Sequence, residues 1–221
     1  TLVSGIIGGL YSSTATISVL ARKSRKASEQ EATDYVAAML LAVSMMFLRF
    51  MILILIFSRE IFLSIYPYLL TMAVVAAIVA WFIHSRQKRP EDQPAETEED
   101  DSSNPLEFKV ALIFAVLFVI FTFLTHYTLV YAGTGGLNLL SFVSGFSDIT
   151  PFILNLLQNT GSVAALIITA CSMQAIISNI MVNMFYALFF AGKGSKLRPW
   201  ILGGFGVVIT CNLVLLLFFY I

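Results

Sequence analysis

The sequence predicts an all-α integral membrane protein, a polytopic bundle of about seven membrane segments in two related halves. Of its 221 residues, 58% are hydrophobic and only 12% are charged, too few polar residues to cover a soluble globule. Several apolar runs reach 19 to 29 residues, long enough for helices to cross a hydrocarbon core about 30 Å thick. The runs lack the alternation typical of β-barrel strands, so helices are predicted.

Seven membrane segments are predicted, at residues 2–20, 35–57, 61–83, 108–131, 137–157, 163–191 and 200–221. The hydrophilic stretch at 85–106 begins basic and turns acidic, with seven acids between residues 90 and 104. This composition predicts a disordered, charged cytoplasmic linker. The linker separates a first membrane half, 1–84, from a second, 107–221.

The two halves repeat each other weakly. Aligning residues 8–20 with 144–156 pairs Gly9 with Gly145, Ser12 with Asp148 and Thr14 with Thr150. Farther along, Ser44 falls on Ser172 after a register change of eight residues. Such a repeat predicts a pseudosymmetric bundle whose shared site lies between the halves.

The distribution of lysine and arginine predicts the orientation. If every segment spans, one face receives the basic residues at 22–26 and 86–89 and is predicted to be cytoplasmic. The basic loop KGSKLR, 193–198, then lies on the opposite face, where it fits poorly. It fits better if segment 2–20 or segment 137–157 enters and leaves by one face, which would make the repeat inverted. Both arrangements stay open.

Two charges stand out among the 26 charged side chains, because only Arg49 and Asp148 lie deep within predicted segments. Placing either charge near the bilayer centre costs about 2.5 to 3.5 kcal/mol, which is tolerated mainly beside a partner, a cavity or a transport route. Since the charges are of opposite sign, Arg49 is predicted to balance Asp148.

Both halves are predicted to contain a broken helix, at residues 5–15 and 145–151. Gly145 permits unusual backbone angles, and Thr150 before Pro151 is typical of an N-cap followed by the first helical residue. Backbone groups left unpaired at a mid-membrane break must face protein or water. The predicted ion-binding residues at the two breaks are Asp148, Ser147, Thr150, Ser12, Ser13 and Thr14. Their oxygens suit a proton or a hard cation.

Plainer interpretations of the same residues stay open. Asp148 would then only cap the second half of a broken helix, and Gly5-x-x-x-Gly9 would only pack helices together. The segment 163–191 carries a polar stripe of Ser172, Asn179 and Asn183. Buried amides need partners, so this stripe is predicted to face the bundle, either as packing contacts or as the lining of a permeation path.

The sequence shows no catalytic motif, so we expect no enzyme and no cofactor. G-x-S-x-G, H-E-x-x-H and a phosphate loop in its strand and helix context are absent. Cys171 and Cys211 both fall inside predicted segments, where they are interpreted as small apolar residues. Nothing in the sequence predicts a nucleic-acid partner, and the identity of any metal stays open.

Four stretches resemble one known family. GGLYSSTATISVLARKSR resembles the Ser-Ser-Thr-Ala signature and Arg-rich turn of the membrane domain of unknown function found at the C-terminus of many bacterial MgtC/SapB-type proteins. NPLEFKVALIFAVLF, GLNLLSFVSGFSD and ISNIMVNMF resemble three later elements of that family. The resemblance covers nearly the whole chain.

The resemblance implies which residues matter and where the protein resides. The matching site positions are Ser12, Ser13, Thr14, Arg49, Asp148 and Asn179. Asn183 stands where the family pattern has a lysine. If that lysine neutralises Asp148 in relatives, this chain manages the charge of Asp148 differently. The resemblance further implies an MgtC-like domain ahead of Thr1, a multi-pass location in a bacterial inner membrane, and a link to divalent-cation stress or transport.

These observations predict a transporter or channel component for a small ion, either a proton or a metal cation, with its site near Asp148 between the halves. The expected partners are the lipid bilayer and a small cation, and self-association into a homo-oligomer stays open. The alternative is a structural or regulatory membrane module that binds another membrane protein and transports nothing.

Overall fold

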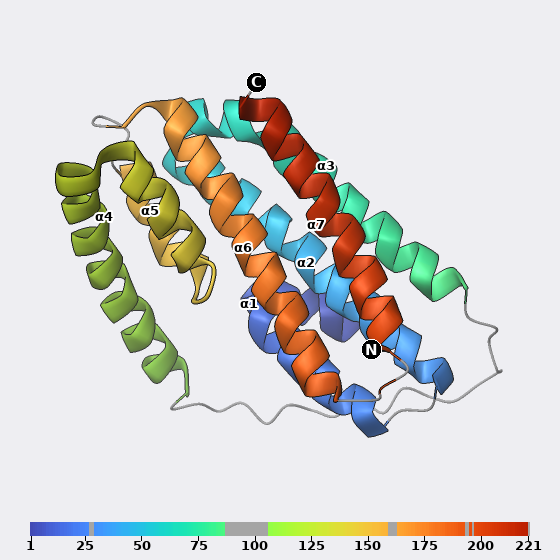
Figure 1. Ribbon diagram of the computed structural model, residues 1–221. Helices are drawn as coiled ribbons and strands as arrows, with labels where there is room; N and C mark the ends of the chain where they lie inside the picture. Colours follow the sequence, from blue (N-terminus) through green and yellow to red (C-terminus); the bar gives the residue numbers. More distant parts are fainter. Residues whose placement is uncertain (27–28, 87–105, 159–162, 193–194, 196, 221) are drawn as a thin grey trace.

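The computed structural model describes residues 1–26, 29–86, 106–158, 163–192, 195 and 197–220 (Figure 1). Every regular element within these residues is a helix, which confirms the predicted all-α class. The helices are α1 (Leu2–Lys23), the short 3-10 helix η1 (Ser24–Lys26), α2 (Glu29–Phe57), α3 (Arg59–Ser85), α4 (Leu106–Ser144), α5 (Ile149–Gln158), α6 (Ala165–Ala191) and α7 (Arg198–Tyr220). Nearly all of the predicted linker lies outside the described residues.

The helices have the length and composition of a multi-pass membrane protein. Five stretches of the described chain are long and apolar enough to cross a membrane: Leu2–Lys23, Thr33–Phe57, Arg59–Ser85, Ala165–Ala191 and Arg198–Phe218. Three shorter apolar helices accompany them, Phe118–Gly133, Gly135–Ser144 and Ile149–Gln158. The predicted count of seven spanning segments is therefore not confirmed.

Helix α1 is interrupted within the predicted range 5–15 and folds back on itself. Ser12 has extended backbone angles, φ −155° and ψ 108°. A Cβ atom added at Gly8 would lie 3.2 Å from Cβ of Thr16, although eight residues of unbroken helix rise about 12 Å. The two limbs therefore form a hairpin centred on Ser12. Each limb is about 15 Å long, half the thickness of a hydrocarbon core.

The second predicted break is also present. Because of this break, segment 137–157 is not the single spanning helix that the sequence predicted. Gly133, with φ 56°, bends α4, and α4 then ends at Ser144. Successive bonds such as Gly145 N–H to the Phe142 carbonyl form a tight turn before α5 starts at Ile149. Figure 1 shows α5 running back from this turn. Two ten-residue helices are each about 15 Å long, half the thickness of a hydrocarbon core, so composition alone did not distinguish a helical hairpin from a span.

Each hairpin enters beside the long helix that follows it. Gly5 and Gly9 abut Ala38 and Ala42 of α2, so small residues four apart on both helices allow close backbone approach. In the second hairpin, Ser141 donates to Gln174 of α6 at 2.9 Å, and Gly145 abuts Ser178. The entering limb thus runs parallel to α2 in one half and parallel to α6 in the other. A separation of 33 positions recurs in all four of these contacts.

The hairpins enter from opposite faces of the bundle (Figure 1). The end of α1 lies beside the end of α6, because Arg25 donates to the carbonyls of Phe189 and Phe190. The start of α2 lies beside the end of α3, where His84 Nδ1 and Asp34 Oδ1 are 2.6 Å apart. The face formed by these helix ends carries the described basic residues Arg22, Lys23, Arg25, Arg86 and Arg198. Arg59 lies at the other face, where α2 gives way to α3.

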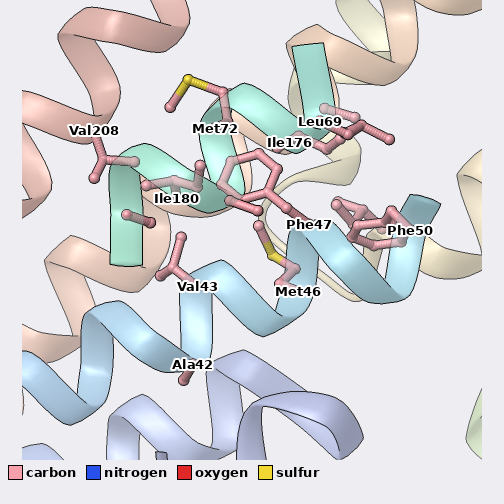
Figure 2. Packing of buried hydrophobic residues seen from close by; sticks show 14 of the residues in the cluster. Ala42, Val43, Met46, Phe47, Phe50, Leu69, Met72, Ile176, Ile180 and Val208 are labelled. Atoms are coloured by element: carbon pink, nitrogen blue, oxygen red, sulfur yellow. The ribbon is translucent and has the colours of Figure 1, made fainter. Parts of the chain in front are cut away.

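The long helices α2, α3, α6 and α7 hold the hairpins in place through a shared apolar core. Figure 2 shows Phe47 of α2 among Met72 of α3, Ile176 of α6 and Val208 of α7. These side chains are almost fully buried. Polar contacts add direction: Ser44 donates to the Ala73 carbonyl at 2.8 Å, and Tyr68 donates to Asn212 across α3 and α7.

Candidate functional site

The tips of the two hairpins meet around a cavity of about 370 Å³. Its wall combines residues 12–15 and 145–149 from the tips with side chains from α2 and α6. Each tip lies at the end of a limb about 15 Å long, which is half the thickness of a hydrocarbon core of about 30 Å. Of the predicted site residues, the wall includes Ser12, Ser13, Thr14, Arg49, Ser147, Asp148 and Asn179.

Arg49 links the two hairpins from its position on α2. Its Nη1 donates to the Tyr11 carbonyl at 2.7 Å, and its Nη2 donates to Oγ1 of Thr150 at 3.3 Å. The first bond satisfies a backbone acceptor at the end of an entering limb, where no intrahelical partner exists. Among the described residues, the buried Nε atom of Arg49 has no hydrogen-bond partner. The guanidinium is thus held at both tips, and some of its N–H groups have no hydrogen-bond partner among the described residues.

Asp148 caps α5 and also contributes its charge to the cavity. Its Oδ1 accepts from the Thr150 N–H at 2.9 Å, and the helix starts at the next residue, Ile149. The predicted cap, Thr150, is therefore wrong by two positions, because a carboxylate two residues earlier already satisfies its N–H. Asp148 is exposed at the cavity wall. It attracts Arg49 electrostatically, although these two described side chains form no direct ion pair within 4.0 Å.

Asn179 of α6 donates hydrogen bonds to backbone carbonyls of the second tip, as Arg49 does to a carbonyl of the first. Its Nδ2 donates to the Gly145 carbonyl at 3.2 Å and lies 3.5 Å from the Ser147 carbonyl. Ser178 adds a bond to the Phe142 carbonyl at 2.7 Å. The acceptors left by the end of α4 are therefore satisfied from α6, as a break inside a membrane requires.

The two tips share one pattern of caps. Ser12 Oγ accepts from the Ala15 N–H at 3.3 Å, as Asp148 accepts from Thr150. A side chain of the following long helix donates to the carbonyl just before each cap, Tyr11 in one half and Ser147 in the other. Different residues thus satisfy the unpaired backbone groups at the two helix breaks in the same way.

The remaining predicted site residues, Thr150, Asn183 and Ser172, do not form the cavity wall. Thr150 contacts Arg49 directly. Asn183 donates to Oδ1 of Asn179 at 3.1 Å, and Ser172 donates to the carbonyl of Ile168 in its own helix. In the polar stripe, Asn179 alone of the three reaches the wall, while Ser172 and Asn183 make packing contacts.

The wall also includes residues that the sequence interpretation did not single out, among them Ser18, Met46 and Val182. Ser18 lies one helical turn beyond Thr14 and donates to its carbonyl at 2.8 Å. Helical spacing from the Ser-Ser-Thr run was the available signal for Ser18. Met46 and Val182 look like ordinary core residues of apolar helices, and no sequence signal marks them.

No metal centre is evident in the described part of the chain, where no group of three or more His, Cys, Asp or Glu residues is placed to hold an ion. Both cysteines are free thiols, and Cys171 donates to Oδ1 of Asn138 at 3.4 Å. The cavity instead brings hydroxyl and amide groups together around one carboxylate and one guanidinium.

Comparison with known proteins gives a family match and one full-length relative. The family model of the domain of unknown function DUF4010 matches residues 1–191. An uncharacterized protein of Aquifex aeolicus (strain VF5) is 24% identical over 220 residues, which cover 97% of this chain and 93% of that protein. No solved structure matches. The family match contains every residue of the cavity wall, and neither name states an activity.

Proposed function

The chain belongs to the DUF4010 family, a family of domains of unknown function, and on that premise we propose that it is a transporter or channel component that moves a small charged solute across the membrane. One observation supports this most strongly: the tips of two helical hairpins meet around a cavity whose wall contains Arg49 and Asp148. Limbs about half a hydrocarbon core in length would place this cavity near mid-membrane. Charged side chains at that depth, and irregular backbone lining a cavity, are features of substrate and ion pathways.

The proposed site belongs to neither half alone. Asp148, Ser147 and Thr150 come from the second hairpin, Ser12, Ser13 and Thr14 from the first, and Arg49 joins them. A solute bound there contacts elements that enter from opposite faces. Small movements of the hairpins would then expose it to one side or the other, as in transporters with a fixed central site.

We further propose that residues 1–84 and 107–221 are halves of an inverted repeat. One shift of 136 positions relates Gly9, Ser12 and Ala42 to Gly145, Asp148 and Ser178. The recurring contact separation of 33 positions supports this shift. It replaces the eight-residue register change expected from the sequence, and it favours the inverted arrangement because the hairpins enter from opposite faces.

The same topology supports an orientation in the membrane. With both hairpins re-entrant, one face carries the described basic residues Arg22, Lys23, Arg25 and Arg86, against Arg59 at the other. The positive-inside rule assigns the more basic face to the cytoplasm. The chain order places the start of α7, and with it Arg198, at that face too. We therefore propose the bacterial inner membrane, while the link to MgtC/SapB-type proteins and an upstream MgtC-like domain stay predictions from the motif resemblance. The expectation that the chain is not an enzyme also stays a prediction.

Solute flux in proteoliposomes tests the proposal. Asp148→Asn keeps an oxygen to cap α5 but removes the charge, so we expect flux of protons, metal cations or small organic ions to be lost. The matched control is Asp34→Asn, which removes a carboxylate that pairs with His84 away from the cavity. Equal flux through the wild type and Asp148→Asn, for every solute that moves, would dispose of the site.

The alternative, a module that binds another membrane protein and transports nothing, draws on helix α7. A Cβ atom added at Gly203 or Gly206 would meet no atom within 4 Å, so this small-residue surface lies open to the membrane. Leucine at Gly203 and Gly206 would then abolish function while Asp148→Asn would leave it intact. The opposite pattern supports transport.

A further inference from the structure

The cavity is larger than a bare ion needs. A volume of about 370 Å³ corresponds to roughly a dozen water molecules at about 30 Å³ each. It falls in the range of about 300 to 1,000 Å³ that is typical of pockets for small organic molecules. A proton or a metal cation would leave most of this space to water.

The cavity wall presents one charge of each sign. Arg49 uses one N–H on each terminal nitrogen for the Tyr11 carbonyl and Thr150, and a guanidinium has a second N–H on each of them. The cap to Thr150 uses only Oδ1 of Asp148. Since the two described groups form no direct ion pair, a solute between them can engage both.

The backbone around the cavity favours a carboxylate near Arg49. Residues 13–15 and Ile149 belong to the first turns of the two returning limbs, and all of them line the wall. Helix starts present N–H groups without intrahelical partners and a partial positive charge. The caps Ser12 and Asp148 use one N–H group at each start, those of Ala15 and Thr150. The competing carbonyls at the ends of the entering limbs already accept bonds from Arg49 and Asn179. A lone cation would therefore meet a guanidinium and two helix starts, with a single carboxylate to attract it.

From this arrangement we infer that the site takes a small zwitterion of amino-acid size. Its carboxylate lies against Arg49 and the helix starts, and its ammonium group lies against Asp148 with the hydroxyls of the tips. This assignment rests on the proposed function, because it names the substrate class of the same site. It replaces the bare proton or metal cation expected from the sequence, because the sequence assigned Arg49 only to balancing the charge of Asp148 and did not place two helix starts at the same cavity.

Calorimetric titration of the purified full chain in lipid nanodiscs tests the inference. One panel holds zwitterions (glycine, L-alanine, L-serine, β-alanine and glycine betaine). The matched panels hold carboxylates without an amine (acetate, propionate), amines without a carboxylate (methylamine, ethylamine), and the chlorides of sodium, potassium and magnesium. We expect at least one zwitterion to bind, at least about tenfold more tightly than its carboxylate or its amine analogue, since hydrogen bonds to charged groups contribute on this scale.

Asp148→Asn is the decisive variant because asparagine preserves the helix cap. We expect the affinity for the zwitterion to fall about ten- to a hundredfold while the affinity for the matching carboxylate does not fall. Arg49→Gln should lower the affinity for both the zwitterion and the matching carboxylate. Asp34→Asn should bind like the wild type. Equal zwitterion affinity in Asp148→Asn and the wild type, binding of a metal chloride alone, or no binding in any panel would overturn the inference.

Counterflow of the bound solute in proteoliposomes separates this inference from the proposed function. Zwitterion binding without counterflow contradicts transport and leaves the assignment of the ligand class standing. Flux of a cation or a proton without zwitterion binding contradicts the ligand class and leaves transport standing.

Discussion

At the scale of single residues, Asp148 has two separable duties. Its carboxylate oxygen caps α5 through the Thr150 N–H, and its charge faces Arg49 across the cavity. The sequence predicted both duties in part. A glycine and a proline on either side of an acid in an apolar run indicate a broken helix, and a carboxylate in such a run needs a partner of opposite charge. The geometry of the cap could not be predicted, since the residues at 147, 148 and 150 all have side-chain oxygens able to cap a helix.

Comparing two substitutions at this position isolates the cap. Asp148→Asn and Asp148→Ala both remove the charge, but only asparagine retains a capping oxygen. We expect Asp148→Ala to be less stable than Asp148→Asn by about 1 kcal/mol, the usual effect of losing an N-cap. Denaturant unfolding in detergent measures the difference. Equal unfolding midpoints would mean that the Asp148 bond to Thr150 does not hold the start of α5.

At the scale of elements, the breaks were predictable and the reversals were not. Glycine, serine and proline within apolar runs indicated interruptions at 5–15 and 145–151, and the chain breaks at Ser12 and after Ser144. Two half-length helices, however, have the same apolar composition as one spanning helix, so segment 137–157 was expected to cross. The direction of the returning limb is set by tertiary contacts, such as Asn155 Nδ2 to Thr122 Oγ1 at 2.8 Å, which no local pattern reveals.

The close approach of the first hairpin to α2 predicts a sharp contrast between two glycines. A Cβ atom at Gly9 would lie 2.6 Å from the Ala42 Cα atom, whereas one at Gly135 would meet nothing within 4 Å. Gly9→Ala should therefore destabilise by about 1 to 3 kcal/mol through overpacking. Gly135→Ala, in an exposed helical position, should be neutral or stabilising by up to about 1 kcal/mol. Thermal unfolding in detergent compares the two, and tolerance of alanine at Gly9 would argue against the tight contact with α2.

At the scale of the whole molecule, the proposed re-entry of both hairpins reconciles the charge distribution with the topology. With both segments spanning, the loop 193–198 fell on the face opposite the other basic residues. With both segments re-entrant, the end of α1 lies beside the end of α6, and the basic residues gather. The sequence left open whether segment 2–20 or segment 137–157 enters and leaves by one face. Hydropathy could not decide this, because it does not record where a helix turns back.

Thiol labelling in intact membrane vesicles checks the topology of the second hairpin. In a background with Cys171 and Cys211 replaced by alanine, cysteine is introduced at Tyr131 or Gln158, both exposed. An impermeant maleimide should label both from the same side, since the chain enters and leaves by one face between them. Cysteine at Ser85, exposed at the end of α3 on the basic face, serves as the control for the other side. Labelling of the Tyr131 and Gln158 variants from opposite sides would mean that the segment between them crosses the membrane.

The most direct measurement of the central claim is cross-linking of the two tips to each other. Ser13→Cys and Ser147→Cys, each at the cavity wall, are combined in the same cysteine-free background, with a protease site placed in the segment between α3 and α4. After treatment with a short bifunctional thiol reagent and cleavage, we predict that the two halves stay joined in the double variant and separate in each single variant. Halves that separate in the double variant despite complete thiol modification would contradict a shared cavity.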